Sequence, residues 1–333
     1  MASSTNYEPV SAPWVWNAAD IATRDDWIFP LSAAALEDID SALSDVKRRE
    51  LEMDSITASD FPLPSFTADL AAIKSGLVGG LGMGLLRGVP VDRYDRDDLR
   101  LILWGIGAHI GLGAPQSFRG DKIGDVMDMS HTGDIRRSYR SPRPLYLHVD
   151  PIDIVGLLCT RQAKEGGWSL LTSAMALHNT LLSERPDLMP ALYRGYHYSS
   201  TEASSTGEPP ITSYRVPVYS AVGEQIVVNF NASPIGKALD SGDKENDADT
   251  LEAFELFKET AMREDLVFRT MLEPGDLQFL NNRLVLHGRT RFEDFSELER
   301  KRHMLRVWLK MPDWAAWPDN MYWHEKGYRL SDG

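Results

Sequence analysis

The sequence has only one cysteine, Cys159, among its 333 residues, so no disulfide can form within the chain. The segment 155–159 that contains it is apolar, which predicts a buried strand and a packing role for the thiol rather than a reactive one. The first residues also lack the basic and apolar regions of a secretory signal. Because a chain without disulfides suits a reducing compartment, these absences predict a cytoplasmic protein.

Basic residues are scarce relative to acidic ones. The chain has 35 Lys and Arg against 49 Asp and Glu, which gives a formal net charge of -14. Nucleic acids and anionic membranes both bind basic surfaces, so neither is an expected partner. A small anionic substrate stays compatible with this charge, because a pocket can be locally positive within an acidic protein.

Long apolar runs are missing as well. The most apolar stretches, near 76–86 and 101–114, are too short or too interrupted to cross a bilayer. We therefore expect no membrane-spanning segment, and the partner that remains is a small-molecule substrate.

The sequence does contain a candidate set of metal ligands: His148 and Asp150, separated by one residue, and His287 far downstream. Two imidazoles and one carboxylate are the ligands of the facial triad that holds Fe(II) and leaves other coordination positions open. Residues i and i+2 of a strand point to the same side, so His148 and Asp150 can face one metal while Val149 faces away. An isolated His-x-Asp is weak, and a histidine beside an aspartate without a metal is the commoner arrangement.

The strand expected after His287 carries a second signal. Alternation over 301–309 places Arg302, Met304, Arg306 and Trp308 on one face. Two guanidiniums beside Met and Trp favour a pocket that accepts carboxylates, because arginine offers them a planar fork. The alternative is an edge strand with solvated arginines.

An arginine beside the distal histidine is what a 2-oxoglutarate site needs. The keto acid chelates iron through its C1 carboxylate and C2 oxygen, and its far carboxylate requires a cation. Arg302 lies 15 residues after His287, enough for a turn and a return on a neighbouring strand. Ser169, after the turn 166–168, has a hydroxyl that can donate to the same carboxylate, although Gly-Gly-x-Ser alone is a common turn.

Hydrophobic patterns predict a helical first part followed by a strand-rich remainder. Helices are expected after Ser32, after Pro64 and from Asp97, then near 173–183, after Pro186 and over 248–264. Strands are expected near 82–90, 123–129, 145–150, 154–160, 168–172, 194–199, 213–219, 225–230, 267–272, 276–281, 284–288 and 302–310. The segment 240–249 is polar and predicts a loop.

This pattern predicts a mainly β fold with flanking helices, closed as a barrel or jelly roll that holds the metal in its mouth. No linker separates two cores. We expect one domain over 1–333, with a helical N-terminal part at about 1–120, a jelly-roll core at about 80–312 and a tail over 313–333. Trp314, Trp317 and Trp323 are expected to pack this tail onto the barrel, and a lid role is the alternative.

Four motifs in this order resemble the TauD/TfdA family of Fe(II)/2-oxoglutarate-dependent dioxygenases, which is related to taurine dioxygenase and clavaminate synthase. They are HVD (148–150), GGWS (166–169), PGDLQFLNNRLVLHGRTRFED (274–294) and RHMLRVWL (302–309). The resemblance covers roughly residues 75–312. It implies a double-stranded β-helix core of the cupin-like, jelly-roll type.

The resemblance also implies roles for single residues. His148, Asp150 and His287 correspond to the iron ligands, and Arg302 corresponds to the anchor of the C5 carboxylate of 2-oxoglutarate. Ser169 falls where many members have Thr in a GGDT sequence, so the hydroxyl is kept while the Asp of that sequence is replaced by Trp.

Three further residues correspond to substrate-contacting positions of the family. Arg306 falls where several members bind an acidic substrate group, and Gln116 and Arg119 lie in a loop that often contacts substrate. Asn281 and Asn282 precede the His287 strand, and we expect them to fix a turn or to hydrogen-bond around the metal ligands rather than to bind metal.

The function that these residues favour is that of an enzyme using Fe(II), 2-oxoglutarate and O2 to oxidise a small, acidic or amino-acid-like substrate, with release of succinate and CO2. Hydroxylation is the default outcome, and desaturation or cyclisation would follow if the substrate radical is kept from rebound. A jelly-roll metalloprotein with hydrolase or isomerase activity using Zn or Mn is an alternative, and a binding module with a decayed site is another. Many family members self-associate, so a homo-oligomer stays open.

Overall fold

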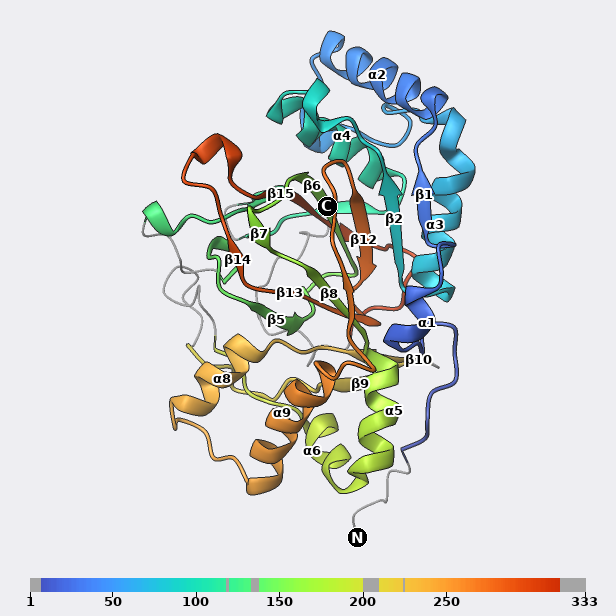
Figure 1. Ribbon diagram of the computed structural model, residues 1–333. Helices are drawn as coiled ribbons and strands as arrows, with labels where there is room; N and C mark the ends of the chain where they lie inside the picture. The colour runs from blue at the N-terminus through green and yellow to red at the C-terminus, as the bar shows by residue number, and fades with distance from the viewer. Residues whose placement is uncertain (1–6, 118–119, 133–137, 200–209, 224, 318–333) are drawn as a thin grey trace.

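The computed structural model describes residues 7–117, 120–132, 138–199, 210–223 and 225–317 (Figure 1). Its larger sheet has seven strands in the order β1-β2-β12-β6-β15-β3, and β4 also pairs with β15. These strands are β1 (Ile28–Pro30), β2 (Met83–Arg87), β12 (Leu277–Asn281), β6 (Ile154–Arg161), β15 (His303–Lys310), β3 (Leu112–Ala114) and β4 (Ile123–Val126). Only β1 and β2 run parallel, and every other pair in the sheet is antiparallel.

The smaller main sheet has four antiparallel strands in the order β11-β8-β13-β5. They are β11 (Phe268–Thr270), β8 (Ser169–Ser173), β13 (Val285–Arg289) and β5 (Leu145–His148). Two short hydrogen-bonded pairs complete the strands: β9 (Tyr219–Val222) with β10 (Gln225–Val228), and β7 (Glu165–Gly166) with β14 (Phe292–Glu293).

Helices cover the outer faces of both main sheets. Figure 1 shows α2, α3 and α4 on one side of the sheets and α5, α6, α8 and α9 on the other. The helices are α1 (Ala18–Ala22), α2 (Ala33–Arg48), α3 (Thr67–Gly79), α4 (Arg96–Ala108), α5 (Ala174–Glu184), α6 (Met189–Arg194), α8 (Ala232–Asp240) and α9 (Ala248–Ala261). Short 3-10 turns lie at Met53–Ser55, Pro64–Phe66, Val91–Arg93, Ser130–Thr132, Ser138–Arg140, Pro186–Leu188 and Leu298–Arg300.

Alternation along the strands divides the apolar side chains among three clusters. On β15, Leu305 and Val307 pack with α2, α3 and α4, whereas Met304 and Trp308 face the space between the two main sheets. On β13, Val285 faces the same space, whereas Leu286 packs with α5, α6, α8 and α9. The two sheets therefore enclose an interior lined by every second residue of each strand, as the period of two requires.

Several local predictions are confirmed. The Ser32 side chain caps α2 by accepting from the backbone N–H of Ala35. Cys159 lies on β6 with 1% of its surface exposed, and burial raises the pKa of its thiol to about 12. Within the described residues, no helix has the length and apolarity needed to cross a membrane.

Other local predictions are wrong. The segment 194–199 forms only isolated bridges, at Tyr196 and Ser199, rather than a strand. The strand expected over 213–219 starts only at Tyr219, after Pro217, which has no backbone N–H to give to a ladder. A helix that the sequence did not predict, α8, begins after Asn231, whose side chain accepts from the backbone N–H of Ser233.

Candidate active site

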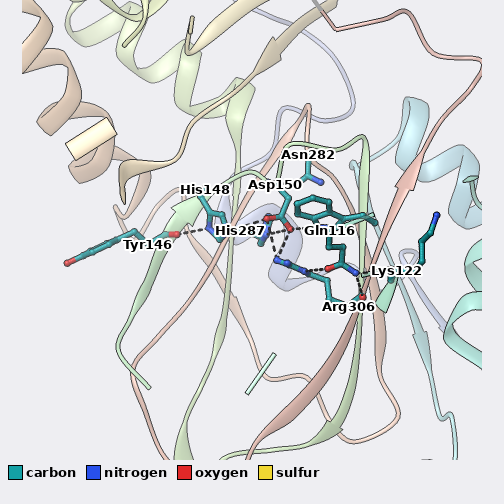
Figure 2. A network of polar contacts seen from close by, with 9 residues as sticks. Gln116, Lys122, Tyr146, His148, Asp150, Asn282, His287 and Arg306 are labelled. Atoms are coloured by element: carbon teal, nitrogen blue, oxygen red, sulfur yellow. Dashed lines mark hydrogen bonds and ion pairs between the residues drawn. The ribbon is translucent and has the colours of Figure 1, made fainter. Parts of the chain in front are cut away.

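The three predicted metal ligands converge between the two main sheets, as Figure 2 shows. His148 on β5 is the direct cross-strand partner of His287 on β13, and their ring centroids lie 4.4 Å apart. Asp150 follows β5, and each of its carboxylate oxygens lies 3.9 Å from Nε2 of one imidazole. Val149 packs in the outer cluster with α5 and α9, so the expected alternation is confirmed. All three side chains are buried.

The protonation states of the triad suit a metal ion. Nδ1 of His148 lies 2.8 Å from the carbonyl oxygen of Tyr146, which can only accept, so this nitrogen donates and Nε2 keeps its lone pair. Burial lowers the pKa of His148, and burial together with the neighbouring His148 lowers the pKa of His287 to about 3. Burial alone would raise the pKa of Asp150, but Arg306 and the two imidazoles outweigh it and lower that pKa. Neutral imidazoles and an ionised carboxylate are the forms that bind a divalent cation.

Neighbouring side chains fix the orientation of Asp150. The indole Nε1 of Trp308 donates to its Oδ2 at 2.9 Å, and Nη1 of Arg306 lies 3.3 Å from the same oxygen. The side-chain oxygen of Asn282 accepts the backbone N–H of Asp150 at 3.0 Å. Asn281 instead holds the turn, by donating to the carbonyl of Leu77 and accepting the backbone N–H of Arg283. The hydrogen-bonding roles expected for the two asparagines are therefore confirmed.

Arg306 is fixed beside the triad by Gln116. Its Nε donates to Oε1 of Gln116 at 2.7 Å, and the Gln116 amide donates in return to the carbonyls of Arg306 and Lys122 (Figure 2). The Nη2 atom of Arg306 makes no hydrogen bond to a described residue, whereas Nη1 faces Asp150. The structure thus brings Arg306 and Gln116 together at the triad, and Arg119 lies outside the described residues.

Arg302, the residue just before β15, is also buried between the sheets, with 5% of its surface exposed. Its Nη2 contacts the sulfur of Met304 at 3.0 Å, and its buried Nη1 has no hydrogen-bond partner among the described residues. Burial lowers the pKa of this guanidinium. The arginines on this face are therefore enclosed in the interior, and the alternative of a solvated edge strand is wrong.

The Gly-Gly turn before Ser169 lies against this arginine. Gly167 has a positive φ of +77°, and a Cβ on it would lie 3.3 Å from Nε of Arg302. Gly166 also has a positive φ, +75°, and a Cβ there would come within 2.3 Å of the carbonyl oxygen of Arg291. Only glycine meets both demands, so the turn can bring the chain close to Arg302. Ser169 follows at the start of β8, and its hydroxyl makes no hydrogen bond within the described residues.

Sequence reasoning missed a further buried arginine, Arg289 at the end of β13. It is 4% exposed and pairs in register with Ser169 of β8. Its side chain donates to the backbone carbonyls of Ser141 and Arg143, and burial, followed by the charge of Arg302, lowers its pKa to about 9. The signal that could have found it is alternation, because Arg289 stands two residues after His287.

Sequence comparison places this site in a family. The chain matches the family described as taurine catabolism dioxygenase TauD, TfdA family, over residues 47–308. The chain belongs to the TauD/TfdA family. This TauD/TfdA enzyme is accordingly an oxidoreductase, and the resemblance seen in its motifs is confirmed.

Two curated relatives of this TauD/TfdA enzyme cover most of its length. It is 27% identical to FR-33289 synthase of Streptomyces rubellomurinus (strain ATCC 31215) in an alignment of 332 positions that covers 97% of each chain. It is 26% identical to the taurine hydroxylase-like protein SAT17 of Stachybotrys chartarum (strain CBS 109288 / IBT 7711), over 91% of this chain and 80% of the relative.

Solved structures share the fold. An asparagine oxygenase in complex with Fe(II), 2S,3S-3-hydroxyasparagine and succinate superposes with a TM-score of 0.67 at 17% identity, over 85% of this chain and 93% of the other. The non-heme iron oxygenase OrfP in complex with Fe and alpha-ketoglutaric acid gives a TM-score of 0.62 at 14% identity, over 85% of this chain and 93% of the other. The predicted jelly-roll core with flanking helices is confirmed for this TauD/TfdA enzyme.

Proposed function

We propose that this enzyme is an Fe(II)/2-oxoglutarate-dependent oxygenase that oxidises a small, anionic or amino-acid-like substrate and releases succinate and CO2. The observation that carries the proposal is a buried triad of His148, Asp150 and His287 in the same interior as Arg302, whose buried Nη1 has no partner among the described residues. The names of the similar structures, which mention iron, alpha-ketoglutaric acid and succinate, support the same chemistry.

In this proposal the three triad side chains hold the iron, and the bound ion supplies the reaction with dioxygen. The remaining protein groups orient the metal ligands and neutralise the charges of bound carboxylates. The indole of Trp308 and the amide of Asn282 hold Asp150 in place, so its carboxylate presents a fixed edge to the metal. For hydroxylation, one oxygen atom of O2 ends in succinate and the other in the substrate hydroxyl group.

Arg302 and Ser169 are the proposed anchors of the far carboxylate of 2-oxoglutarate. A buried guanidinium without a counter-ion is unfavourable, and a carboxylate that accepts from its Nη1 would offset that cost. The Zn or Mn hydrolase or isomerase class would share the triad, but it gives no reason for an unpaired arginine at this place.

We propose that Arg306 binds an acidic group of the substrate. Gln116 holds the guanidinium by its Nε, and Nη2 is left to donate. The relative named for taurine and the structures named for asparagine oxygenase and hydroxy-L-Arg support an amino-acid-like substrate with an acidic group.

The single buried cysteine supports a cytoplasmic location.

The test begins with an anaerobic titration of the purified protein with Fe(II) and then 2-oxoglutarate, followed in the visible region. We expect the charge-transfer band of a chelated keto acid, and succinate release when air and a panel of acidic and amino-acid substrates are added. An Arg302→Leu variant should weaken 2-oxoglutarate binding and leave metal affinity nearly unchanged. If the wild-type protein gives no charge-transfer band and releases no succinate, the proposal is refuted. A collapse of metal affinity in Arg302→Leu would refute the role of Arg302.

A further inference from the structure

We propose that Arg289 is a second cation for the far carboxylate of the keto acid, so that two buried guanidiniums select a dicarboxylate. This inference rests on the proposed function and extends it to a residue outside the predicted site. It is carried by the position of Arg289 on β13, by its approach to Arg302 and by the lack of a counter-ion for either group in the part of the chain that the structure describes.

Arg289 faces the same interior as the metal triad. Along β13, Val285 packs between the sheets and Leu286 packs outside, so His287 and Arg289 both face inward. Pairing with β8 is regular through this region and sets Arg289 opposite Ser169. Two residues of a strand span about 7 Å, which is on the order of the length of a five-carbon keto acid. A keto acid that binds a metal held by His287 would therefore extend toward Arg289.

Arg289 and Arg302 approach each other around one aromatic ring. The Cζ atoms of Arg289 and Arg302 lie 4.3 and 5.4 Å from the ring centroid of Phe292. The two arginines come from opposite sides of the interior, Arg289 from the end of β13 in the smaller main sheet and Arg302 from the residue before β15 of the larger sheet. The space beside Phe292 therefore receives two guanidiniums from two sides.

Neither guanidinium has a counter-ion among the described residues. Nη1 of Arg289 and Nη1 of Arg302 are both buried and without a hydrogen bond. Of the acidic groups nearby, Asp128 pairs with Lys301. Asp294 accepts the backbone N–H of Arg302 through Oδ1, and its buried Oδ2 makes no hydrogen bond to either guanidinium. Two unpaired buried cations are costly, and one carboxylate offers an oxygen to each Nη1.

Arg289 also has a structural contact, which the test must separate from binding. Its Nε donates to the carbonyl of Thr290, and its Nη2 donates to the carbonyls of Ser141 and Arg143, in the segment that leads into β5. These bonds use two of its three nitrogens. Nη1 is the nitrogen that remains for a ligand.

The experiment compares two keto acids that differ only at the far end: 2-oxoglutarate and 2-oxopentanoate, which has a methyl group in place of the carboxylate. Their dissociation constants are measured calorimetrically and anaerobically on Fe(II)-loaded protein. In Arg289→Gln, we expect 2-oxoglutarate to bind about 10- to 100-fold more weakly, as for a lost hydrogen bond to a charged group, and 2-oxopentanoate to bind as in the wild type. Arg302→Gln should lose 2-oxoglutarate affinity in the same selective way.

Arg215→Gln is the matched control, because Arg215 also donates to backbone carbonyls, those of Gly195 and Glu245, but lies beside the end of α6. It should bind both acids as the wild type does. If Arg289→Gln binds both keto acids equally more weakly than the wild type, Arg289 only positions the backbone and the inference is overturned. The inference is also overturned if the variant binds both keto acids as the wild type does.

Arg302→Gln gives a second test that does not require an Arg289 variant to fold. If Arg289 is a second cation, this variant keeps a preference for 2-oxoglutarate over 2-oxopentanoate, and loss of that preference would overturn the inference. A wild-type protein that binds neither keto acid would instead refute the proposed function itself.

Discussion

Trp308 illustrates how one hydrogen bond can decide the geometry of a metal ligand. Its indole N–H donates to Oδ2 of Asp150, the same oxygen that lies 3.9 Å from Nε2 of His287. Trp308→Phe keeps an aromatic side chain but removes this donor. We expect metal affinity to fall about 10- to 100-fold, because residues that orient metal ligands have effects of that size. Anaerobic Fe(II) titration measures the change.

Trp104→Phe is the matched control for this prediction. Trp104 is also buried, and its indole N–H donates to the carbonyl of Ile56, among the helices outside the larger sheet. Its loss should leave metal affinity unchanged. Equal metal affinity in Trp308→Phe and the wild type would mean that the indole does not orient Asp150.

Gln278 presents the opposite situation, a polar side chain in an apolar setting. It is fully buried on β12, where its neighbours along the strand, Leu277 and Phe279, face the helices, so its amide faces the space between the sheets. Neither amide atom has a partner among the described residues. We expect Gln278→Met to raise the free energy of unfolding by about 1–3 kcal/mol, because it removes unsatisfied buried groups at similar volume. Urea denaturation measures the change.

Gln116→Met provides the contrast. The Gln116 amide is buried with its oxygen on Arg306 and its nitrogen on two carbonyls, so the same substitution should lower stability. If Gln278→Met is no more stable than the wild type, the Gln278 amide is satisfied in solution, for example by water.

At the residue scale, the sequence predicted the triad because strand periodicity places His148 and Asp150 on one side and the family motifs add His287. The contacts around the triad were harder to predict from the sequence. Trp308 was expected to line the pocket, but its donation to Asp150 depends on the register between β15 and the segment after β5. Alternation from His287 could have placed Arg289 in the interior, but its approach to Arg302 around Phe292 depends on contacts between two sheets.

At the scale of elements, one buried ion pair joins the turn between β12 and β13 to the C-terminal segment. Arg283 lies 2.7 Å from Asp153, and both side chains are 5% exposed. The guanidinium also lies over the rings of Trp314 and Trp317, at 5.1 and 4.8 Å. Asp153 accepts the indole N–H of Trp317 in addition. The expected packing is confirmed for these two tryptophans, whereas Trp323 lies outside the described residues.

Arg283→Leu should therefore be strongly destabilising. The substitution leaves Asp153 buried and without its charge partner, a change that typically costs about 3–5 kcal/mol. Chemical denaturation measures this loss. Lys164→Gln is the control, because Lys164 pairs with Glu293 and both side chains are exposed, so the loss of stability should be much smaller than in Arg283→Leu. A similar loss of unfolding free energy in the two variants would mean that the buried ion pair is no more important for stability than the exposed one.

Element predictions succeeded where local signals were complete. The Ser32 cap and the apolar periodicity were sufficient for α2, and the alternation over β15 separated its two faces correctly. They failed where tertiary contacts decide. The segment 194–199 has strand-forming residues but pairs only at single bridges, and α8 contains Ser233, Pro234 and Gly236, which disfavour a helix in isolation.

At the scale of the whole molecule, the sequence predicted a jelly roll flanked by helices because ligands from distant segments had to meet. It could not predict the strand order. β15 lies between β6 and β3 and also pairs with β4, and these partners come from segments about 150 to 190 residues earlier in the chain. Such long-range pairing leaves no local mark in the sequence, so the positions of Arg289 and Gln278 in the interior required the structure.

The burial of two histidines in this interior also predicts how the stability of the whole protein depends on pH. Burial holds the pKa of His287 at about 3, below the value of about 6.5 expected in the unfolded chain, and it lowers the pKa of His148 as well. Between these two values the unfolded chain binds a proton that the folded protein does not, so the free energy of unfolding rises with pH. Metal-free protein should therefore lose stability as pH falls below about 6.5, by up to about 1.4 kcal/mol per pH unit from His287, and His148 contributes with the same sign.

A His287→Gln variant isolates the contribution of one proton. Urea denaturation of the metal-free wild type and of the variant between pH 4.5 and 6.5, a window chosen from the two pKa values of about 3 and 6.5, gives two slopes. The slope of the unfolding free energy against pH reports the protons taken up on unfolding. In the variant it should correspond to about one proton fewer, because glutamine does not titrate, while His148 and other buried histidines still contribute. Identical slopes would mean that His287 is not held neutral by burial, and the ligand state deduced for the triad would then be wrong.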